Sequence, residues 1–159
     1  MTDFSDLLRP DAVMTGLSVT SRKALFQQLG TLAAPVIGPA TGIDAREVTE
    51  RLAVREKLGS TGFGGGVAIP HAKLDGIAAP VGLFIRLGQP IAFDAVDDLP
   101  VDLVFALLSP TGAGSDHLKA LARVSRQLRD RAFLAKLRGA GSRDALYALF
   151  TASDARHEA

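Results

Sequence analysis

The chain has 159 residues, of which 47% are hydrophobic and 22% charged, and its 18 Lys and Arg against 17 Asp and Glu leave a formal net charge of +1. This balance excludes a disordered chain and argues against a protein whose main role is to bind nucleic acid or an anionic membrane. Without cysteine there is no disulfide, no thiolate nucleophile and no cysteine-based metal site.

Neither a membrane span nor a signal peptide is predicted. The longest clean apolar run, residues 103–108, is far shorter than the roughly 20 residues that cross a bilayer. The opening MTDFSDLLRP has acidic residues where a signal peptide needs a basic and then an apolar stretch. We therefore expect a cytoplasmic protein with no membrane insertion.

The first part of the chain predicts one strand and two helices. After an irregular lead-in, residues 12–19 indicate a short strand, and Ser21 supplies the N-cap of an amphipathic helix. The Gly-Pro pair at 38–39 should stop that helix, because proline cannot continue it. Asp44 then opens a second helix, with a capping box, that runs through Arg55.

A glycine-rich segment follows, GSTGFGGGVAIPHAKLDGI at residues 59–77. It has too much glycine for a helix and is too apolar at residues 67–69 for a plain linker. We predict a long loop that feeds a short strand ending at Pro70 and His71.

The next segments predict strands. Apolar residues alternate between 81 and 87, as in a half-buried strand, whereas the denser run at 101–108 is typical of a strand buried on both faces. Prolines at every tenth position from 70 to 110 punctuate these strands.

Three helices are expected at the C-terminal end. The first begins near Asp116 or His117, the second ends at Gly139, and the third runs from Ser142 to Phe150. The apolar face expected for the first of them consists of Leu118, Leu121, Ala122, Ser125 and Leu128. Together these elements predict an α/β fold, a mixed β-sheet flanked by α-helices, in a single domain at 1–152 with a flexible tail at 153–159.

The glycine segment fits no nucleotide-binding motif. A P-loop would need a Lys-Ser or Lys-Thr pair after the glycines, and a dinucleotide fingerprint would need glycine where Val67 stands. Its amides, unobstructed at Gly64, Gly65 and Gly66, nevertheless suit a phosphate-sized anion. A mobile surface turn is the alternative.

His71 is the residue in this segment that could do chemistry. Pro70 stiffens the backbone that delivers it, and a histidine near neutrality offers one ring nitrogen as a nucleophile. The alternative is an ordinary surface histidine beside a glycine turn.

Other polar residues could serve the same anion. His117, at a predicted helix start, could help to hold it or be an ordinary first-turn residue. Arg55 could bind a phosphate bidentately or be a solvated arginine at a helix end. Ser60 and Thr61 could donate hydroxyls, or simply stabilise the turn. The histidines lack HxxxH or HxH spacing, so a metal site has only weak support. A catalytic carboxylate pair or a solvated turn could explain the acids Asp94, Asp97, Asp98 and Asp102.

Three blocks of sequence resemble the fructose/mannitol-type enzyme IIA domains of the bacterial phosphoenolpyruvate-dependent phosphotransferase system (PTS), within them most closely the nitrogen-regulatory branch. The blocks are GSTGFGGGVAIPHAKLDG, PIAFDAVDDLPVDLVFALLSP and DHLKALARVSRQL, and the likeness extends over residues 7–150. The stretch G-x-A-I-P-H matches the family's phosphorylation motif. Departures are confined to the loop, at Phe63, Gly65 and Ala72.

The resemblance implies a role for each site residue. His71 matches the phosphohistidine, which accepts a phosphoryl group from the phosphohistidine of a small HPr-like carrier (NPr). His117 matches an assisting histidine, and Arg55 matches an arginine that contacts the phosphate. No cofactor is implied. Regulatory targets in the family include a sensor kinase, a potassium transporter and a stringent-response enzyme.

Three functions remain open at this point. The first is a regulatory phosphocarrier of the nitrogen-regulatory PTS, and the second is a sugar-transport enzyme IIA that passes phosphate to a IIB domain. The absence of a fused IIB, IIC or HPr-like segment favours the first. The third is a phosphate-binding hydrolase that uses His71 with the acids at 94–102.

Overall fold

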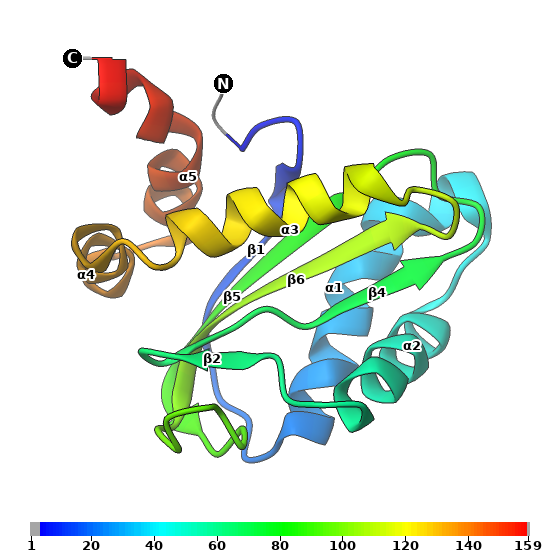
Figure 1. Cartoon of the computed structure of the whole chain (residues 1–159), viewed down its shortest axis with the longest axis horizontal. Helices are drawn as coiled ribbons and strands as arrows, with labels where there is room; N and C mark the ends of the chain where they lie inside the picture. The colour runs from blue at the N-terminus through cyan, green and yellow to red at the C-terminus, as the bar shows by residue number, and fades with distance from the viewer. Residues whose placement is uncertain (1–3, 159) are drawn as a thin grey trace.

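Six strands form one mixed sheet in the computed structural model, which describes residues 4–158 (Figure 1). The strand order is β1-β5-β6-β3-β2, and β4 also pairs with β6. The strands are β1 (Leu8–Leu17), β2 (Gly62–Gly64), β3 (Val67–Ala68), β4 (His71–Leu74), β5 (Val81–Ile91) and β6 (Val101–Pro110). The helices are α1 (Arg22–Thr41), α2 (Ala45–Lys57), α3 (Ser115–Gln127), α4 (Arg131–Gly139) and α5 (Arg143–Glu158).

The helices cover both faces of the sheet, with α1 behind it and α3 in front in the view of Figure 1. This arrangement confirms the predicted α/β fold in a single domain. Within residues 4–158, no helix combines the length and the apolar character needed to cross a membrane.

The antiparallel pair β5–β6 is the centre of the core. Strand β6 is buried on both faces, as its dense apolar run predicts. The half-buried prediction for β5 is wrong, because Gly82, Leu83, Phe84 and Ile85 are all buried. The alternation was misleading because the intervening positions hold glycine and phenylalanine, which pack against the core as well.

Aromatic rings join the C-terminal helices to this centre. Phe150 of α5 lies 4.9 Å from Phe84, 5.6 Å from Phe105 and 5.3 Å from Phe133 of α4, measured between ring centroids. Such edge and tilted contacts each add about 0.5–1.5 kcal/mol to the burial of the rings. The cluster thus packs the C-terminal helices onto the middle of the β5–β6 pair, where Phe84 is opposite Phe105.

Two element boundaries near the N-terminus differ from the sequence prediction. Strand β1 begins at Leu8 rather than at residue 12, and α1 continues through Pro39 to Thr41. Pro39 is exposed and lies in the last turn, so it forfeits one backbone hydrogen bond, to the Pro35 carbonyl, only two residues before the helix ends. The Thr41 hydroxyl closes the helix by donating to the Ile37 carbonyl at 2.7 Å.

At the other end of the chain, α5 continues past Phe150 to Glu158, so the predicted end of that helix is wrong. Residues 153–158 of the expected tail are helical, and Ala159 lies outside the described residues. Flexibility of this tail remains a prediction. The N-cap was predicted correctly, since Ser142 Oγ accepts from the Ala145 N–H at 3.1 Å.

The glycine-rich segment is the largest departure from the prediction. In place of a long loop it forms the antiparallel hairpin β2–β3, after which the chain enters β4. Both β3 and β4 run parallel to β6, one after the other along the same strand. Pro70, which has no N–H to offer a partner strand, lies between them, and its carbonyl accepts from the Leu107 N–H at 2.9 Å. His71 therefore begins a strand instead of ending one.

Candidate functional site

The imidazole of His71 is held at both nitrogens. Its Nδ1 lies 2.9 Å from the carbonyl oxygen of Ile69, and its Nε2 lies 3.2 Å from Nε of Arg55. A carbonyl oxygen can only accept, so Nδ1 carries the proton, and the arginine N–H donates to the lone pair of Nε2. Nε2 therefore carries the lone pair of a neutral ring.

Arg55 reaches His71 from the last turn of α2. A second guanidinium nitrogen donates to the Gly59 carbonyl at 2.9 Å, just beyond the helix end. Asp44 caps the start of this helix and accepts from the Glu47 N–H, as the sequence predicts. The guanidinium thus lies beside the lone pair of His71 Nε2, with one edge fixed to the backbone.

His117 lies in the first turn of α3, and its ring centroid is 5.5 Å from that of His71. The residue is only 7% exposed, and its Nδ1 is 2.7 Å from the hydroxyl oxygen of Ser109 at the end of β6. The three residues that the family resemblance singles out, His71, His117 and Arg55, therefore come together although they belong to three separate elements.

The buried face of α3 differs from the prediction. His117, Ala120 and Val124 face the sheet, whereas Leu118 is 65% exposed. The prediction followed leucine spacing, but the helix is rotated so that the histidine is inside. Only Leu128 of the predicted face is buried.

Both histidines favour the neutral form. Burial lowers the pKa of His71 most, the Arg55 charge lowers it further, and the hydrogen bond to the Ile69 carbonyl and the Glu56 charge oppose these effects. Burial also lowers the pKa of His117, helped by the charges of His71 and Lys73. A neutral ring is the form that can attack phosphorus.

His71 and Arg55 form the wall between two surface hollows. The larger has a volume of about 380 Å³, and it is lined by Arg51, Val54, Arg55, Leu58, His71, Ala72, Lys73 and His117. The smaller has a volume of about 210 Å³, and it is lined by Arg55, Ser60, Thr61, Gly62, Phe63, Ile69, His71, Val96, Leu121 and Ser125. A third hollow, of about 480 Å³ between α1 and α2, does not include either histidine.

Ser60 and Thr61 line the smaller hollow, but their hydroxyls serve the turn. Ser60 donates to the Phe93 carbonyl at 2.9 Å and accepts from the Gly62 N–H at 3.1 Å. Thr61 donates to Glu56 through both its amide and its hydroxyl, each at 2.8 Å. These contacts fit the turn-stabilising alternative.

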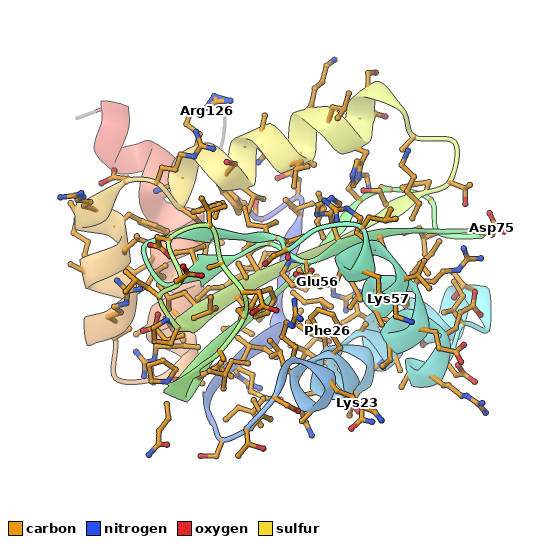
Figure 2. The ribbon with its side chains drawn as sticks, turned by 60° about the horizontal axis from the view of Figure 1, so that its bottom comes forward. Lys23, Phe26, Glu56, Lys57, Asp75 and Arg126 are labelled. Atoms are coloured by element: carbon orange, nitrogen blue, oxygen red, sulfur yellow. The ribbon has the colours of Figure 1, made fainter. Side chains whose placement is uncertain are left out.

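Glu56 is the buried acid that the sequence did not reveal. It is 7% exposed, it lies where α2 meets Phe26 of α1 (Figure 2), and it forms an ion pair with Arg22 at 3.5 Å. Because its carboxylate holds Thr61, it sets the path of the chain from Arg55 into the hairpin. Ser109 was missed as well, since a serine at a strand end has no distinguishing pattern.

Gly64, Gly65 and Gly66 are not brought together with His71. They form the turn of the β2–β3 hairpin, and neither hollow at His71 includes them. The Gly65 N–H donates to Asp97 at 3.0 Å, and the Gly65 carbonyl accepts from Arg138 at 2.7 Å. Gly62, at the start of β2, instead lines the smaller hollow together with His71.

The acids at 94–102 also serve the loop. Asp94 pairs with Arg22 at 3.1 Å, and Asp97 accepts from the Gly65 and Leu99 amides. Asp102 pairs bidentately with Arg138. None of the four acids lines either hollow at His71 within residues 4–158.

Residues 6–153 match the family model described as "Phosphoenolpyruvate-dependent sugar phosphotransferase system, EIIA 2". The chain belongs to this family. A nitrogen regulatory protein of Bradyrhizobium diazoefficiens is 49% identical to it over 145 residues, which cover 91% of this chain and 92% of that protein. One from Klebsiella oxytoca is 39% identical, and the match covers 98% of this chain and 94% of that protein.

Solved EIIA structures share the fold. The crystal structure of nitrogen regulatory protein IIA-Ntr from Neisseria meningitidis superposes with a TM-score of 0.85 at 34% identity, covering 93% of this chain and 99% of that one. Enzyme IIA of the mannitol system from Escherichia coli, solved in complex with phosphorylated enzyme IIB, gives a TM-score of 0.73 at 17% identity and covers 91% of this chain and 98% of that one.

Proposed function

We propose that this EIIA-family protein is a phosphocarrier of the nitrogen-regulatory PTS, which accepts a phosphoryl group on Nε2 of His71 from the phosphohistidine of an HPr-like carrier (NPr). The observation that carries the proposal is the state of His71. Its Nδ1–H is bound to the Ile69 carbonyl, while the lone pair of Nε2 is beside Arg55 at the border of two hollows.

The transfer requires little rearrangement of this site. The lone pair of Nε2 forms a new N–P bond as the N–P bond of the carrier breaks, and the electron pair of the broken bond returns to the carrier's imidazole. The positive charge that develops on the His71 ring is stabilised through Nδ1–H by the Ile69 carbonyl. Arg55 is placed to move its N–H groups from the lone pair of Nε2 to the equatorial oxygens.

The surface around His71 suits a protein donor. Val54 and Leu58 of α2 are 61% and 82% exposed, Val96 is 81% exposed, and Leu118 of α3 is 65% exposed. The first three of these line the two hollows. Exposed apolar side chains grouped around a functional residue are typical of a protein-binding surface.

A regulatory role follows from the relatives and from the charge of a phosphoryl group. The relatives that match almost over their full length are named nitrogen regulatory proteins. Phosphorylation adds about two negative charges to the apolar surface around His71, which changes the partners that this surface can bind. The regulatory targets would be proteins of the classes named for the family.

The test is phosphorylation by a phosphorylated HPr-type carrier. His71→Ala should abolish labelling, whereas His117→Ala should still label at His71 and slow onward transfer. Full labelling of His71→Ala would sink the assignment. A pull-down with phosphorylated and unphosphorylated protein should capture different partners, and identical sets would count against regulation. Efficient transfer to a IIB domain would favour the sugar-transport alternative.

A further inference from the structure

We infer that Ser109 is a positioning residue, whose hydroxyl donates to Nδ1 of His117 and so fixes the proton of that imidazole on Nε2, where it can bind the phosphoryl group. The inference concerns the side chain that orients the assisting histidine, and it rests on the proposed phosphocarrier function. It is carried by the hydrogen-bonding requirements of a buried hydroxyl.

The direction of the Ser109–His117 hydrogen bond can be decided by counting donors. Ser109 is fully buried, and its Oγ lies 2.7 Å from Nδ1 of His117. Within residues 4–158, the Ser109 hydroxyl has no other acceptor to which its proton could go. If Nδ1 carried the proton, this buried O–H would remain unsatisfied, at a cost that native structures rarely tolerate. Ser109 is therefore the donor, and Nδ1 has the lone pair.

A neutral His117 must then carry its proton on Nε2. The two ring nitrogens point in different directions, so the Nε2 edge faces away from Ser109, and His117 lines the same hollow as His71. The ring centroids of the two histidines are 5.5 Å apart, which leaves Nε2–H within reach of a phosphoryl group on His71.

The two histidines are thereby held in opposite tautomers. His71 has its proton on Nδ1 because the Ile69 carbonyl can only accept, and His117 has its proton on Nε2 because Ser109 donates. One ring presents a lone pair to the site and the other presents a hydrogen-bond donor. This difference accounts for one histidine as acceptor and the other as assistant.

The sheet places Ser109 for this task. In the β4–β6 register, His71 is opposite Leu107 and Lys73 is opposite Ser109. Side chains two residues apart lie on the same face of a strand, so Ser109 is on the face that carries His71. The acceptor histidine and the support of the assisting histidine are therefore fixed to the same rigid strand pair.

The test combines a tautomer measurement with a rate. In protein with ¹⁵N-labelled histidine, long-range ¹H–¹⁵N spectra distinguish a protonated ring nitrogen from one with a lone pair. The wild type should show Nε2–H at His117 and Nδ1–H at His71. In Ser109→Ala the ¹⁵N chemical shifts of the two His117 ring nitrogens should move toward each other, because the second tautomer becomes populated. Phosphorylation by the carrier should slow about three- to tenfold.

Two variants make the result specific. Ser109→Thr keeps the hydroxyl and should restore both the spectrum and the rate. Thr15→Val removes another buried hydroxyl of the same sheet, one without a hydrogen-bond partner, and should change neither. If Ser109→Thr does not fold, the spectra of the wild type and Ser109→Ala still decide the matter.

A protonated Nδ1 at His117 in the wild type would overturn the inference, and so would unchanged spectra and rates in Ser109→Ala. Failure of the proposed function gives a different result. In that case the carrier does not phosphorylate the wild type, while the spectra still report whether Ser109 fixes the His117 tautomer.

Discussion

The two ends of the β2–β3 hairpin, its open end beside His71 and its turn around Gly65, contrast with each other. At the end near His71, residues 60–62 and Ile69 line a hollow that Arg55 and His71 share, and the Gly59 carbonyl accepts from Arg55. At the other end, Arg138 and Asp97 hold the turn at Gly65. The first end presents an imidazole and a guanidinium at a surface hollow, whereas at the second the charged groups bind one another and the backbone.

This contrast teaches that glycine in one run can serve two purposes. Gly66 has a φ of +83°, and a Cβ there would come within 2.4 Å of the Arg138 guanidinium. Its role is to let α4 approach the hairpin. Gly62 is buried against Ala95 beneath the site, where a Cβ would come within 2.8 Å of the alanine Cβ. A cluster of glycines is therefore weak evidence for a phosphate loop.

A matched pair of arginine variants gives the largest expected difference between the two ends. Arg55→Gln should slow phosphoryl transfer to His71 by about 10²-fold, the usual effect of removing one donor to transition-state charge. Arg138→Gln should leave the rate within about twofold and cost at most about 1 kcal/mol of stability, since its pair with Asp102 is partly exposed. Initial rates of labelling and thermal melts measure both effects. Equal losses of rate in the two variants would contradict the proposed difference between the two ends of the hairpin.

A substitution in the hairpin turn should lower the stability of the protein without changing phosphoryl transfer. Gly66→Ala forces a side chain into left-handed backbone against Arg138, so the free energy of unfolding should fall by about 2 kcal/mol. Gly112→Ala, at a position with open space and no positive φ, is the control and should change it little. Urea unfolding provides the measurement. If Gly66→Ala also abolished labelling at a temperature where it is folded, the turn would belong to the site.

The smallest expected effect is that of pH. The pKa of His71 lies below its ordinary value of 6.5, chiefly because of burial and next because of Arg55. The reactive neutral form therefore persists below pH 6.5, and the transfer rate should change less than about twofold between pH 7.5 and 6.5. Arg55→Gln lacks the charge that helps to lower the His71 pKa, so its transfer rate should begin to decline at a higher pH. A wild-type rate that halves above pH 7 would contradict this.

The lowered pKa of His71 should also make the free energy of unfolding depend on pH. The unfolded chain binds a proton at the ordinary pKa of 6.5, before the folded chain does. The free energy of unfolding should therefore fall as the pH is lowered through 6.5 toward the lowered pKa. His71→Gln should reduce this dependence in urea titrations between pH 7.5 and 5, and the lowered pKa of His117 should maintain the remainder.

The sequence was sufficient to predict the α/β fold, because strand periodicity and helix caps are local signals, and the Pro70–His71 pair was a local signal that singled out His71 as the candidate. It placed the apolar face of α3 on the leucines, because nothing local shows that His117 is turned inward. Glu56 and Ser109 have no motif at all. Their roles depend on contacts with Thr61 and His117 that only the folded chain creates.

The glycines also have roles that the local sequence does not reveal. Residues 64–66 look alike in sequence to Gly59 and Gly62, and only pairing of β2 with β3 separates the turn from the site. That pairing is in turn fixed by β6, which is some 35 residues further along the chain.

Identification of the phosphorylated nitrogen tests the central claim most directly. The protein, labelled with ¹⁵N-histidine, is phosphorylated by a phosphorylated HPr-type carrier, and ³¹P and ¹⁵N spectra locate the N–P bond. We expect a single phosphohistidine, with phosphorus on Nε2 of His71 and the proton kept on Nδ1. Phosphorus on Nδ1 of His71, or on His117, would contradict the account.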